Sequence, residues 1–536
     1  MRLIACLILL LGGLMQAFSG LSIEVMKNST TVARLGEEVH FGGMLRNENS
    51  TPIDGSIDIR LIDFHGAQSA SRVQPLVLGA NAAKSFTVQL HPEQAGYYAI
   101  CAKACNGASS VANFERIWSL AIFDHAIDVP GDSPFGTYII GNVKMLADIV
   151  PRGFFKNMVQ AGVKWGTLDT WWKRLEPTAG AYHWDYYERW FKEALAVGIT
   201  PIPHLFGIPD WASSYKPGKP SNPWLYPPSD WKAWDKFVYD FVTRYKDWLV
   251  YLRIWNEPNT GYWQGTPADY AKLVIIASQA ARRAKPDIKI IIEAAATANY
   301  DPFPFFDAVD AAGATPYWDL IAIHNYFLNN VDYPERTRFV PTHDAFIQWR
   351  NSHKPNAEAW DTEFACMADD WGTEWKGVGE VHQAQWLARS HVLAFSKGLK
   401  KLFWFPGYSW PDPTTPPYYN PSGLLRADLT PRPAYVAYRT IASALSRAVY
   451  DRSLPLAADQ YAMVFWRPGG YVTTLWSVDA KHAGRIALKF EQSSPVEVIG
   501  LMGQRHSRAL DAARSAAFDI SEEMILVCSE TPPKVQ

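Results

Sequence analysis

The stretch VYLRIWNEPN, residues 250–259, passes from a short apolar run directly into a polar turn. Seven other apolar runs of similar length lie between residues 135 and 405, and each has the length of a buried parallel strand. We therefore predict eight strands, at Phe135–Ile139, Val163–Leu168, Ile199–Leu205, Val250–Trp255, Ile288–Glu293, Leu320–His324, Ala357–Thr362 and Lys401–Phe405.

Longer segments with helical patterns separate these strands. They are clearest at Asp185–Val197, Trp231–Tyr245, Pro267–Ala284 and Val381–Gly398. Strands that alternate with helices in this way favour an α/β fold, a (β/α)8 TIM barrel. A doubly wound open sheet is the alternative, but it should carry a glycine-rich phosphate turn after its first strand, and the sequence has none there.

Both flanks of the barrel have the pattern of β domains. Residues 21–130 alternate short β-like runs with turn residues, which predicts an N-terminal β-sandwich. Proline, glycine and small polar residues at 130–134 indicate a linker, so the barrel is expected to span residues 131–448. Residues 449–536 return to short β runs and predict a small C-terminal β domain.

The charge of the chain is nearly balanced. Its 536 residues include 51 basic and 53 acidic side chains, and 48% of them are hydrophobic. The hydrophobic content is enough for substantial cores and excludes a disordered polymer. A nucleic-acid-binding protein would be expected to carry a basic field, so that class is disfavoured.

Residues 1–20 have the pattern of a secretory signal peptide. Arg2 precedes the apolar stretch Leu3–Leu14, and Ala17-Phe18-Ser19 matches a small-x-small cleavage site. We therefore expect a secreted or periplasmic protein. An uncleaved signal anchor is the alternative, although the apolar run is short for a bilayer span. In an exported chain Cys101 and Cys105 could pair as a local staple.

Two carboxyl groups are predicted at the same rim of the barrel. Glu257 follows the fourth strand in the turn Asn256-Glu257-Pro258, and Glu363 follows the seventh strand in WDTEF, residues 360–364. Such barrels hold their active sites at the C-terminal ends of the strands. Cleavage of an acetal needs one carboxylic acid to protonate the leaving oxygen and a second group to meet the developing oxocarbenium ion. Two rim glutamates suit this chemistry.

The same two segments resemble those of clan A glycoside hydrolases. Within that clan the sequence is most similar to glycoside hydrolase family 39 and its relatives that act on bacterial exopolysaccharide. Further segments agree in order, namely WKRLEP at 172–177, GIPDWAS at 207–213, IHNY at 323–326 and PRPAY at 431–435. The resemblance covers roughly residues 134–448 and leaves both flanking domains unmatched.

The resemblance implies roles for five residues in a retaining double displacement. Glu257 would be the general acid/base, with Asn256 hydrogen-bonding the sugar 2-hydroxyl. Glu363 would be the nucleophile, with Tyr326 and His324 holding its carboxylate. One departure matters, because relatives usually carry an arginine near the end of strand two, where this chain has KWGTL at 164–168. The sequence therefore leaves open what else orients the nucleophile.

Substrate-binding residues are predicted among aromatic and histidine side chains near the rim. Aromatic faces stack on the apolar faces of sugar rings, although most of the 23 tryptophans are expected in cores. Trp404 and Trp410, at and beyond the end of the eighth strand, are the preferred platforms. His204 is predicted to reach the sugar; for it and for His324 a purely structural role is the alternative. No metal or cofactor motif is present, so neither is predicted.

The leading hypothesis is a glycoside hydrolase that acts on a polysaccharide or oligosaccharide. An endo-acting enzyme on exopolysaccharide is slightly favoured over an exo-glycosidase. A non-catalytic carbohydrate-binding or assembly protein is one alternative. A transglycosylase is another, and the same covalent intermediate would serve it.

Overall fold

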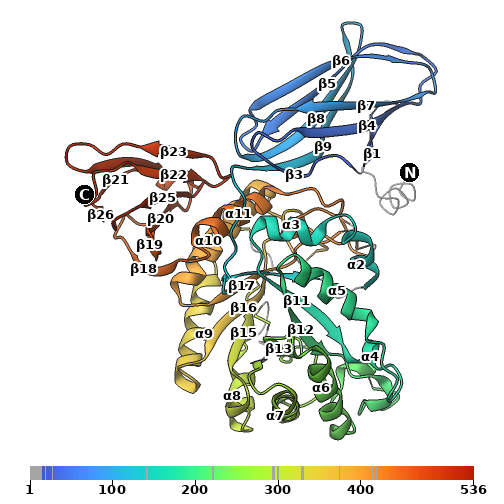
Figure 1. Ribbon diagram of the computed structural model, residues 1–536, viewed down its shortest axis with the longest axis vertical. Helices are drawn as coiled ribbons and strands as arrows, with labels where there is room; N and C mark the ends of the chain where they lie inside the picture. The colour runs from blue at the N-terminus through green and yellow to red at the C-terminus, as the bar shows by residue number, and fades with distance from the viewer. Residues whose placement is uncertain are drawn as a thin grey trace.

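The chain folds into a closed barrel accompanied by two β domains, which both lie toward the upper end of the view in Figure 1. The computed structural model describes residues 15–18, 20–26, 28–139, 143–219, 222–292, 296–297, 301–326, 331–373, 375–412, 414–417 and 419–536. None of the helices in these ranges is long and apolar enough to span a membrane.

Eight parallel strands close the barrel in sequence order, and the last, β17, pairs back with the first, β10. This confirms the predicted fold class. All eight predicted strands are present with small shifts at their ends, and Glu293, the predicted end of the fifth, lies outside the described residues. The strands are β10 Phe135–Ile139, β11 Trp165–Trp171, β12 Thr200–Phe206, β13 Tyr251–Ile254, β14 Lys289–Ile292, β15 Leu320–His324, β16 Glu358–Phe364 and β17 Lys401–Trp404.

Helices follow the strands and surround the barrel (Figure 1). Helix α7 begins with a capping box, in which the Thr266 hydroxyl accepts from the Asp269 amide and the Asp269 carboxylate accepts from the Thr266 amide. The four helices predicted from sequence are present. The α-helices are α2 Val143–Ile149, α3 Phe154–Ala161, α4 Trp172–Leu175, α5 Asp185–Ala196, α6 Trp231–Tyr245, α7 Pro267–Ala284, α8 Phe303–Ala311, α9 Phe339–His353, α10 Glu380–Ser396 and α11 Pro433–Leu445.

Short 3-10 helices lie in the connections between these elements. Four belong to the barrel domain and the fifth to the C-terminal domain. They are η1 Asp210–Ala212, η2 Pro223–Leu225, η3 Thr315–Tyr317, η4 Pro334–Arg336 and η5 Ala480–His482.

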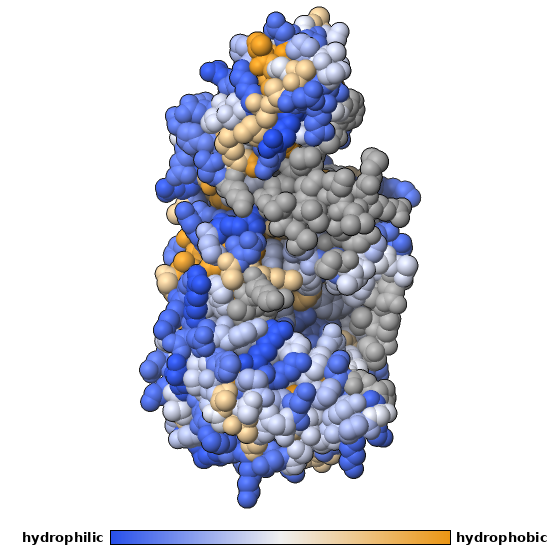
Figure 2. Space-filling model, turned by 90° about the vertical axis from the view of Figure 1, so that its right-hand side faces the viewer, coloured by the Kyte–Doolittle hydropathy of each residue, from blue (hydrophilic) through white to orange (hydrophobic). Residues whose placement is uncertain are grey.

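The N-terminal domain consists of two sheets, in the orders β1-β2-β4-β7 and β3-β9-β8-β5-β6. Their inward side chains form a separate hydrophobic core. The edge strand β6 exposes Val73 and Val77, and Figure 2 shows hydrophobic surface in this upper part of the molecule. The strands are β1 Met15–Phe18, β2 Leu21–Val25, β3 Val32–Arg34, β4 Val39–Asn47, β5 Ile53–Asp63, β6 Gln68–Leu78, β7 Ala83–Leu90, β8 Gly96–Asn106 and β9 Ser109–Phe123.

The predicted Cys101–Cys105 staple is wrong, since both cysteines are free. They lie four residues apart on the single strand β8. An extended strand separates such residues by about 13 Å, well beyond the Cα distance that a disulfide spans. The predicted signal peptide lies mostly outside the described residues, although its residues 15–18 form strand β1, which pairs with β2.

The C-terminal domain packs a six-stranded sheet, β18-β19-β20-β25-β22-β23, against a three-stranded sheet, β24-β21-β26. The other face of the larger sheet joins the core of the barrel domain. The predicted domain boundaries at 20, 130 and 448 stay predictions. The strands are β18 Val449–Ser453, β19 Gln460–Arg467, β20 Gly470–Ser477, β21 Gly484–Lys489, β22 Val496–Gly500, β23 Arg505–Arg508, β24 Ser515–Ile520, β25 Ile525–Ser529 and β26 Lys534–Val535.

Buried arginines dock both β domains onto the barrel. Arg389 on α10 is fully buried and donates to the carbonyls of Ser477 and Val478 in the C-terminal domain, at 3.0 and 3.2 Å. Arg426 donates to the Ser119 hydroxyl of the N-terminal domain at 2.7 Å and pairs with Glu380 at the start of α10 at 2.5 Å. The flanking domains therefore form part of one packed body with the barrel.

Glu380 balances this junction electrostatically. It pairs with Arg426 and, at 2.7 Å, with Arg432, both of which are almost completely buried. Burial raises the pKa of Glu380, but the charges of Arg426, Arg432 and Arg116 outweigh that effect and hold the pKa at about 2. The carboxylate is therefore ionised over the whole range in which the protein is expected to work.

The Glu380→Gln variant is expected to lose about 3 kcal/mol of stability at neutral pH, because two buried guanidinium groups lose their counter-charge. A lowered carboxyl pKa stabilises the fold above the unfolded value of about 4.3, and this contribution disappears as the pH falls toward 2. Denaturant titrations at several pH values should therefore show the wild-type and variant curves converging in acid. Glu193→Gln, which breaks an exposed ion pair with Arg189 on α5, is the control and should change stability little. A pH-independent difference would contradict this account.

Candidate active site

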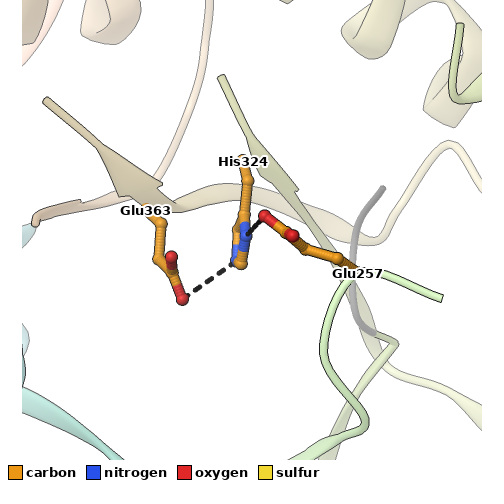
Figure 3. Close-up of side chains that lie close together, drawn as sticks. All are labelled: Glu257, His324 and Glu363. Carbon is orange, nitrogen blue, oxygen red and sulfur yellow. Dashed lines mark hydrogen bonds and ion pairs between the residues drawn. The ribbon is translucent and has the colours of Figure 1, made fainter. Parts of the chain in front are cut away.

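Three side chains from the ends of three different barrel strands meet over the barrel mouth (Figure 3). Glu257 follows β13, His324 ends β15 and Glu363 lies near the end of β16. His324 Nδ1 is 2.9 Å from Glu257 Oε1, and His324 Nε2 is 3.5 Å from Glu363 Oε1. The two glutamates predicted from sequence therefore converge, with the histidine between them.

The carboxylates are close to one another as well as to the histidine. One oxygen of Glu257 and one oxygen of Glu363 lie within 4.8 Å of each other. The Glu363 side chain is 9% exposed and the Glu257 side chain 16%, so both can reach a ligand although the site is largely enclosed by protein.

A β-bulge in β16 directs the Glu363 side chain toward the mouth of the barrel. On one side Asp361 and Glu363 oppose the consecutive residues Ile323 and His324, and on the other side Asp361–Phe364 opposes Leu402–Trp404. Strand β16 therefore carries one extra residue, at Thr362, which interrupts the alternation of side chains. Asp361 consequently faces the helix layer, while Glu363, two residues on, faces the barrel mouth.

Asp361 is held from behind by helix α9. Its Oδ2 is 2.9 Å from His343 Nε2, and both side chains are completely buried. Burial raises the pKa of Asp361, and the hydrogen bond and charge of His343 oppose this rise. Asn325, next to His324, also approaches His343 Nε2, at 3.1 Å. This polar cluster fixes the backbone at the bulge that presents Glu363.

Arg253 is the cation next to Glu363, although the second strand lacks the arginine that relatives usually carry there. It lies on β13, is completely buried, and donates through Nη1 to the hydroxyl of Thr167 on β11, inside the segment where the arginine was expected. Its Nη2 is 3.9 Å from Glu363 Oε1. A guanidinium therefore lies beside Glu363 in this chain, but it comes from the fourth strand instead of the second.

Arg253 also fixes the tautomer of His324. Its Nη2 lies 3.2 Å from His324 Nε2. A guanidinium can only donate, so Nε2 must accept, and the ring proton lies on Nδ1. His324 therefore donates to Glu257, which modifies the expectation that it holds Glu363.

If Glu363 takes part in catalysis as the sequence predicts, the Arg253→Met variant should lower kcat about 100-fold, because it removes a cation held beside that carboxylate. The acidic limb of its pH–rate profile should move to higher pH, since a carboxylate that loses a neighbouring cation protonates more readily. Arg253→Lys keeps the charge and should lose less. Thermal melts of both variants separate this effect from misfolding, and an acidic limb that stays in place would contradict the assigned role.

Tyr326 and Asn256 also lie at the site. The Tyr326 hydroxyl donates to Glu363 Oε2 at 3.5 Å, and burial, followed by the charges of Glu363, Glu257 and Asp361, raises its pKa well above the usual value. It is therefore a neutral donor. Asn256 is half-buried, and its Oδ1 has no hydrogen-bond partner within the described part of the chain.

The backbone around Asn256 is strained. Trp255 and Glu257 adopt φ values of 71° and 42°, in the left-handed region that non-glycine residues rarely enter. Such conformations persist where the surroundings enforce them, and they concentrate at functional sites. Here Trp255 is completely buried, and its indole N–H donates to the Tyr262 carbonyl at 2.9 Å, which fixes the turn that presents Glu257.

Sequence reasoning missed two groups next to the predicted site, Tyr138 on β10 and Asp169 on β11. The Tyr138 hydroxyl donates to Asp169, whose carboxylate is also 3.4 Å from His204 Nδ1. Burial and the charges of Asp169 and Glu363 raise the pKa of Tyr138 well above its usual value. Asp169 lies two residues before the end of β11. A carboxyl group so close to the end of a barrel strand was the one signal in the sequence that could have predicted its place at the site.

Two predicted sugar contacts are wrong. His204 is completely buried, and its Nε2 contacts the Trp255 carbonyl, so it supports the turn before Glu257 from beneath. Trp404 is also completely buried and donates its indole N–H to the Ser422 carbonyl at 2.8 Å. Side chains alternate along a strand, so the residue after Trp404, the half-buried Phe405, is the one that faces the mouth.

Phe405 belongs to an aromatic group on the Glu363 side of the mouth. Its ring centroid is 4.9 Å from that of Tyr138, 6.0 Å from that of Tyr326 and 5.5 Å from that of Trp410. Trp410, the other predicted platform, is half-buried and remains a candidate for sugar stacking.

Glu257, His324 and Glu363 are also residue types that bind metals, and each offers one ligand atom within 4.8 Å of the others. The fit to a cation is poor, however. His324 Nε2, one of the two ring nitrogens, accepts from Arg253, whose own positive charge lies 3.9 Å from Glu363. The arrangement suits proton transfer and carboxylate chemistry better than ion binding.

The fold is that of known glycoside hydrolases, although no family model and no curated protein matches the sequence. The structure is similar to a family 39 glycoside hydrolase from the gut symbiont Bacteroides cellulosilyticus WH2, with 18% identity, a TM-score of 0.74, and 94% of this chain and 99% of that one covered. It is also similar to a glycoside hydrolase family 30 subfamily 8 xylanase from Clostridium acetobutylicum, with 13% identity, 74% and 96% covered and a TM-score of 0.51. A glucosidase from Croceicoccus marinus has 12% identity, 74% and 95% covered and a TM-score of 0.51. The resemblance found in the motifs is thus confirmed at the level of the fold.

Proposed function

We propose that this protein is a retaining glycoside hydrolase that cleaves O-glycosidic bonds in a polysaccharide or oligosaccharide. The observation that carries the proposal is the approach of Glu257 and Glu363 to within 4.8 Å of each other, oxygen to oxygen, at the mouth of the barrel. Retention requires carboxyl groups about 5 Å apart, whereas inversion needs about 6.5 to 9.5 Å to admit a water. The shorter gap supports retention.

The chemistry then proceeds in two displacements. A Glu363 oxygen attacks the anomeric carbon while Glu257 gives its proton to the departing glycosidic oxygen, which leaves as an alcohol. In the second step Glu257 takes a proton from water, and the resulting hydroxide displaces Glu363 from the anomeric carbon. Both carboxyl groups return to their starting states.

The neighbouring groups support these roles. Arg253 and the neutral Tyr326 hydroxyl lie beside Glu363 and favour its ionised form. The Nδ1–H of His324 orients Glu257. The Asn256 amide has a buried oxygen without a partner among the described residues, which supports the proposal that it binds a sugar hydroxyl next to the acid/base.

Aromatic side chains on both sides of the carboxylate pair favour an endo-acting enzyme. Phe405 packs against Trp410 and against Tyr326, which donates to Glu363. On the other side, Tyr262, on which the charge of Glu257 acts, lies next to Trp224. An exo-glycosidase needs to hold one terminal sugar only, whereas rings on both sides suit a chain that continues past the cleaved bond. Product sizes from a polysaccharide panel test this, because release of single sugars alone would exclude endo action.

We further propose that the chain is exported, on the signal pattern of residues 1–20. A carbohydrate polymer outside the cell is the substrate that this location offers. N-terminal sequencing of the mature protein from its native host, with a start after residue 19 or 20, is the expected result. An intact Met1 in the mature protein would contradict it.

Trapping with a panel of activated 2-fluoro glycosides, followed by peptide mapping, tests the proposed function. The fluorine slows the second displacement, so a glycosyl label should accumulate on Glu363. A label on another residue would overturn the assignment, and a folded protein that binds polysaccharide but takes no label would favour the non-catalytic alternative. Added chelator should leave the labelling rate unchanged, because the proposed mechanism needs no metal. The ratio of glycosyl transfer to an added alcohol over transfer to water separates a transglycosylase from a hydrolase.

A further inference from the structure

A lysine on the rim of the barrel is held by two tryptophan rings. Lys173 lies in the short helix α4 directly after β11, and its backbone N–H donates to the Gly207 carbonyl at 2.9 Å. Its ammonium nitrogen is 4.8 Å from the Trp171 ring centroid and 4.9 Å from the Trp224 ring centroid. Cation–π contacts on both rings therefore fix a positive charge at a defined place on the rim.

Aromatic rings connect this lysine to the acid/base. The Trp171 and Trp224 centroids are 4.8 Å apart, and the Trp224 and Tyr262 centroids are 6.4 Å apart. Tyr262 is 46% exposed, and after burial the charge of Glu257 is the largest cause of its raised pKa, ahead of Glu363. We call Trp171, Trp224 and Tyr262 the leaving-group wall, because the charge of Glu257, the carboxyl proposed to protonate the leaving oxygen, acts on Tyr262.

Within the part of the chain that the structure describes, no carboxylate lies within 4.0 Å of the Lys173 ammonium group, so no ion pair balances its charge there. Burial, and then the neighbouring charge of Arg174, lowers the pKa of Lys173, while the charge of Asp210 acts in the opposite direction. A partly desolvated cation beside a second cation is stabilised when an anion binds, and such groups concentrate at functional sites.

Resting on the proposed hydrolase function, we propose that Lys173 and the leaving-group wall form a subsite for an acidic sugar, a uronate, on the leaving-group side of the cleaved bond. The apolar face of the sugar ring would stack on Tyr262 or Trp224, and the uronate carboxylate would accept a charge-assisted hydrogen bond from Lys173. The substrate class is then a polysaccharide in which acidic residues follow the cleaved linkage. A neutral polymer would leave this ammonium group without its partner.

Binding measurements in the Glu363→Gln background test the proposal without turnover. Each polymer in a panel of uronate-containing polysaccharides is paired with its own carboxyl-reduced, neutral form, and affinities are measured at low and high salt. At least one acidic polymer should bind about tenfold more tightly than its reduced form. Adding Lys173→Met, which keeps an apolar stem against the indoles, should abolish that preference and its salt dependence, and Lys173→Arg should keep most of it.

A matched control is Lys272→Met, because Lys272 on α7 also lies over an indole, that of Trp231, at 4.4 Å, but on the outer helix layer. It should leave the preference intact. The proposal is overturned if no acidic polymer is preferred over its reduced form, if Lys173→Met keeps the preference, or if a sulfated neutral polymer shows the same Lys173-dependent gain while no uronate polymer does. The proposed hydrolase function fails separately, through the absence of a 2-fluoro glycoside label in the wild-type protein.

Discussion

Glu363→Gln is expected to reduce turnover of an activated aryl glycoside at least about 1,000-fold while the fold and sugar binding survive. The amide has nearly the shape of the carboxylate but cannot form the glycosyl ester. Steady-state rates, together with isothermal titration of an oligosaccharide, separate the loss of chemistry from any loss of binding.

The same strand offers a control. Glu358 begins β16 at the far end of the barrel, is exposed, and accepts from the Trp360 indole at 2.9 Å. Glu358→Gln should leave turnover within about twofold, because a surface change far from the mouth alters little. Full activity in Glu363→Gln would remove that residue from the mechanism. The smaller variant Glu363→Ala adds a positive test, because azide entering the vacated space should yield a glycosyl azide of inverted configuration.

Much of the barrel could be predicted from sequence for a simple physical reason. Strands buried on both faces must be short apolar runs, and that pattern survives without any tertiary information. The pairing of Glu257 with Glu363 followed in the same way, because parallel strands of a barrel end at one rim. Neither inference needed the path of a loop or the direction of a particular side chain.

The failures concern side-chain direction at strand ends. Trp404 and Phe405 are adjacent aromatic residues, and a shift of one residue exchanges the one that faces the mouth for the one that faces the helices. The bulge at Thr362 changes the alternation in the same manner, and nothing in its local sequence marks the extra residue. Arg253 was quoted within the strand-four motif, yet its partners Thr167 and Glu363 lie on other strands. Only the closed barrel shows that it meets them.

Glu257→Ala is the second change with a large expected effect, and the effect should depend on the leaving group. An acid is needed when the departing oxygen is basic, and general acid catalysis typically contributes about 100- to 10,000-fold. We therefore expect a loss of about 1,000-fold on alkyl glycosides or oligosaccharides and a much smaller loss in the first step on a dinitrophenyl glycoside. A uniform loss across leaving groups would contradict the assignment.

His324, which lies between the two carboxyl groups, makes a second test of the Glu257 role possible. His324 donates its Nδ1–H to Glu257, and removal of that carboxylate leaves the donor without this acceptor while Arg253 still holds Nε2. A small anion such as azide can occupy the vacated position, accept from Nδ1 and attack the glycosyl ester on Glu363. The product should then be a glycosyl azide of retained configuration, opposite to that from Glu363→Ala. Glu363 and Glu257 would lie on opposite sides of one anomeric carbon. An inverted azide product from Glu363→Ala together with a retained one from Glu257→Ala therefore fits a double displacement in which Glu363 attacks and Glu257 transfers the proton.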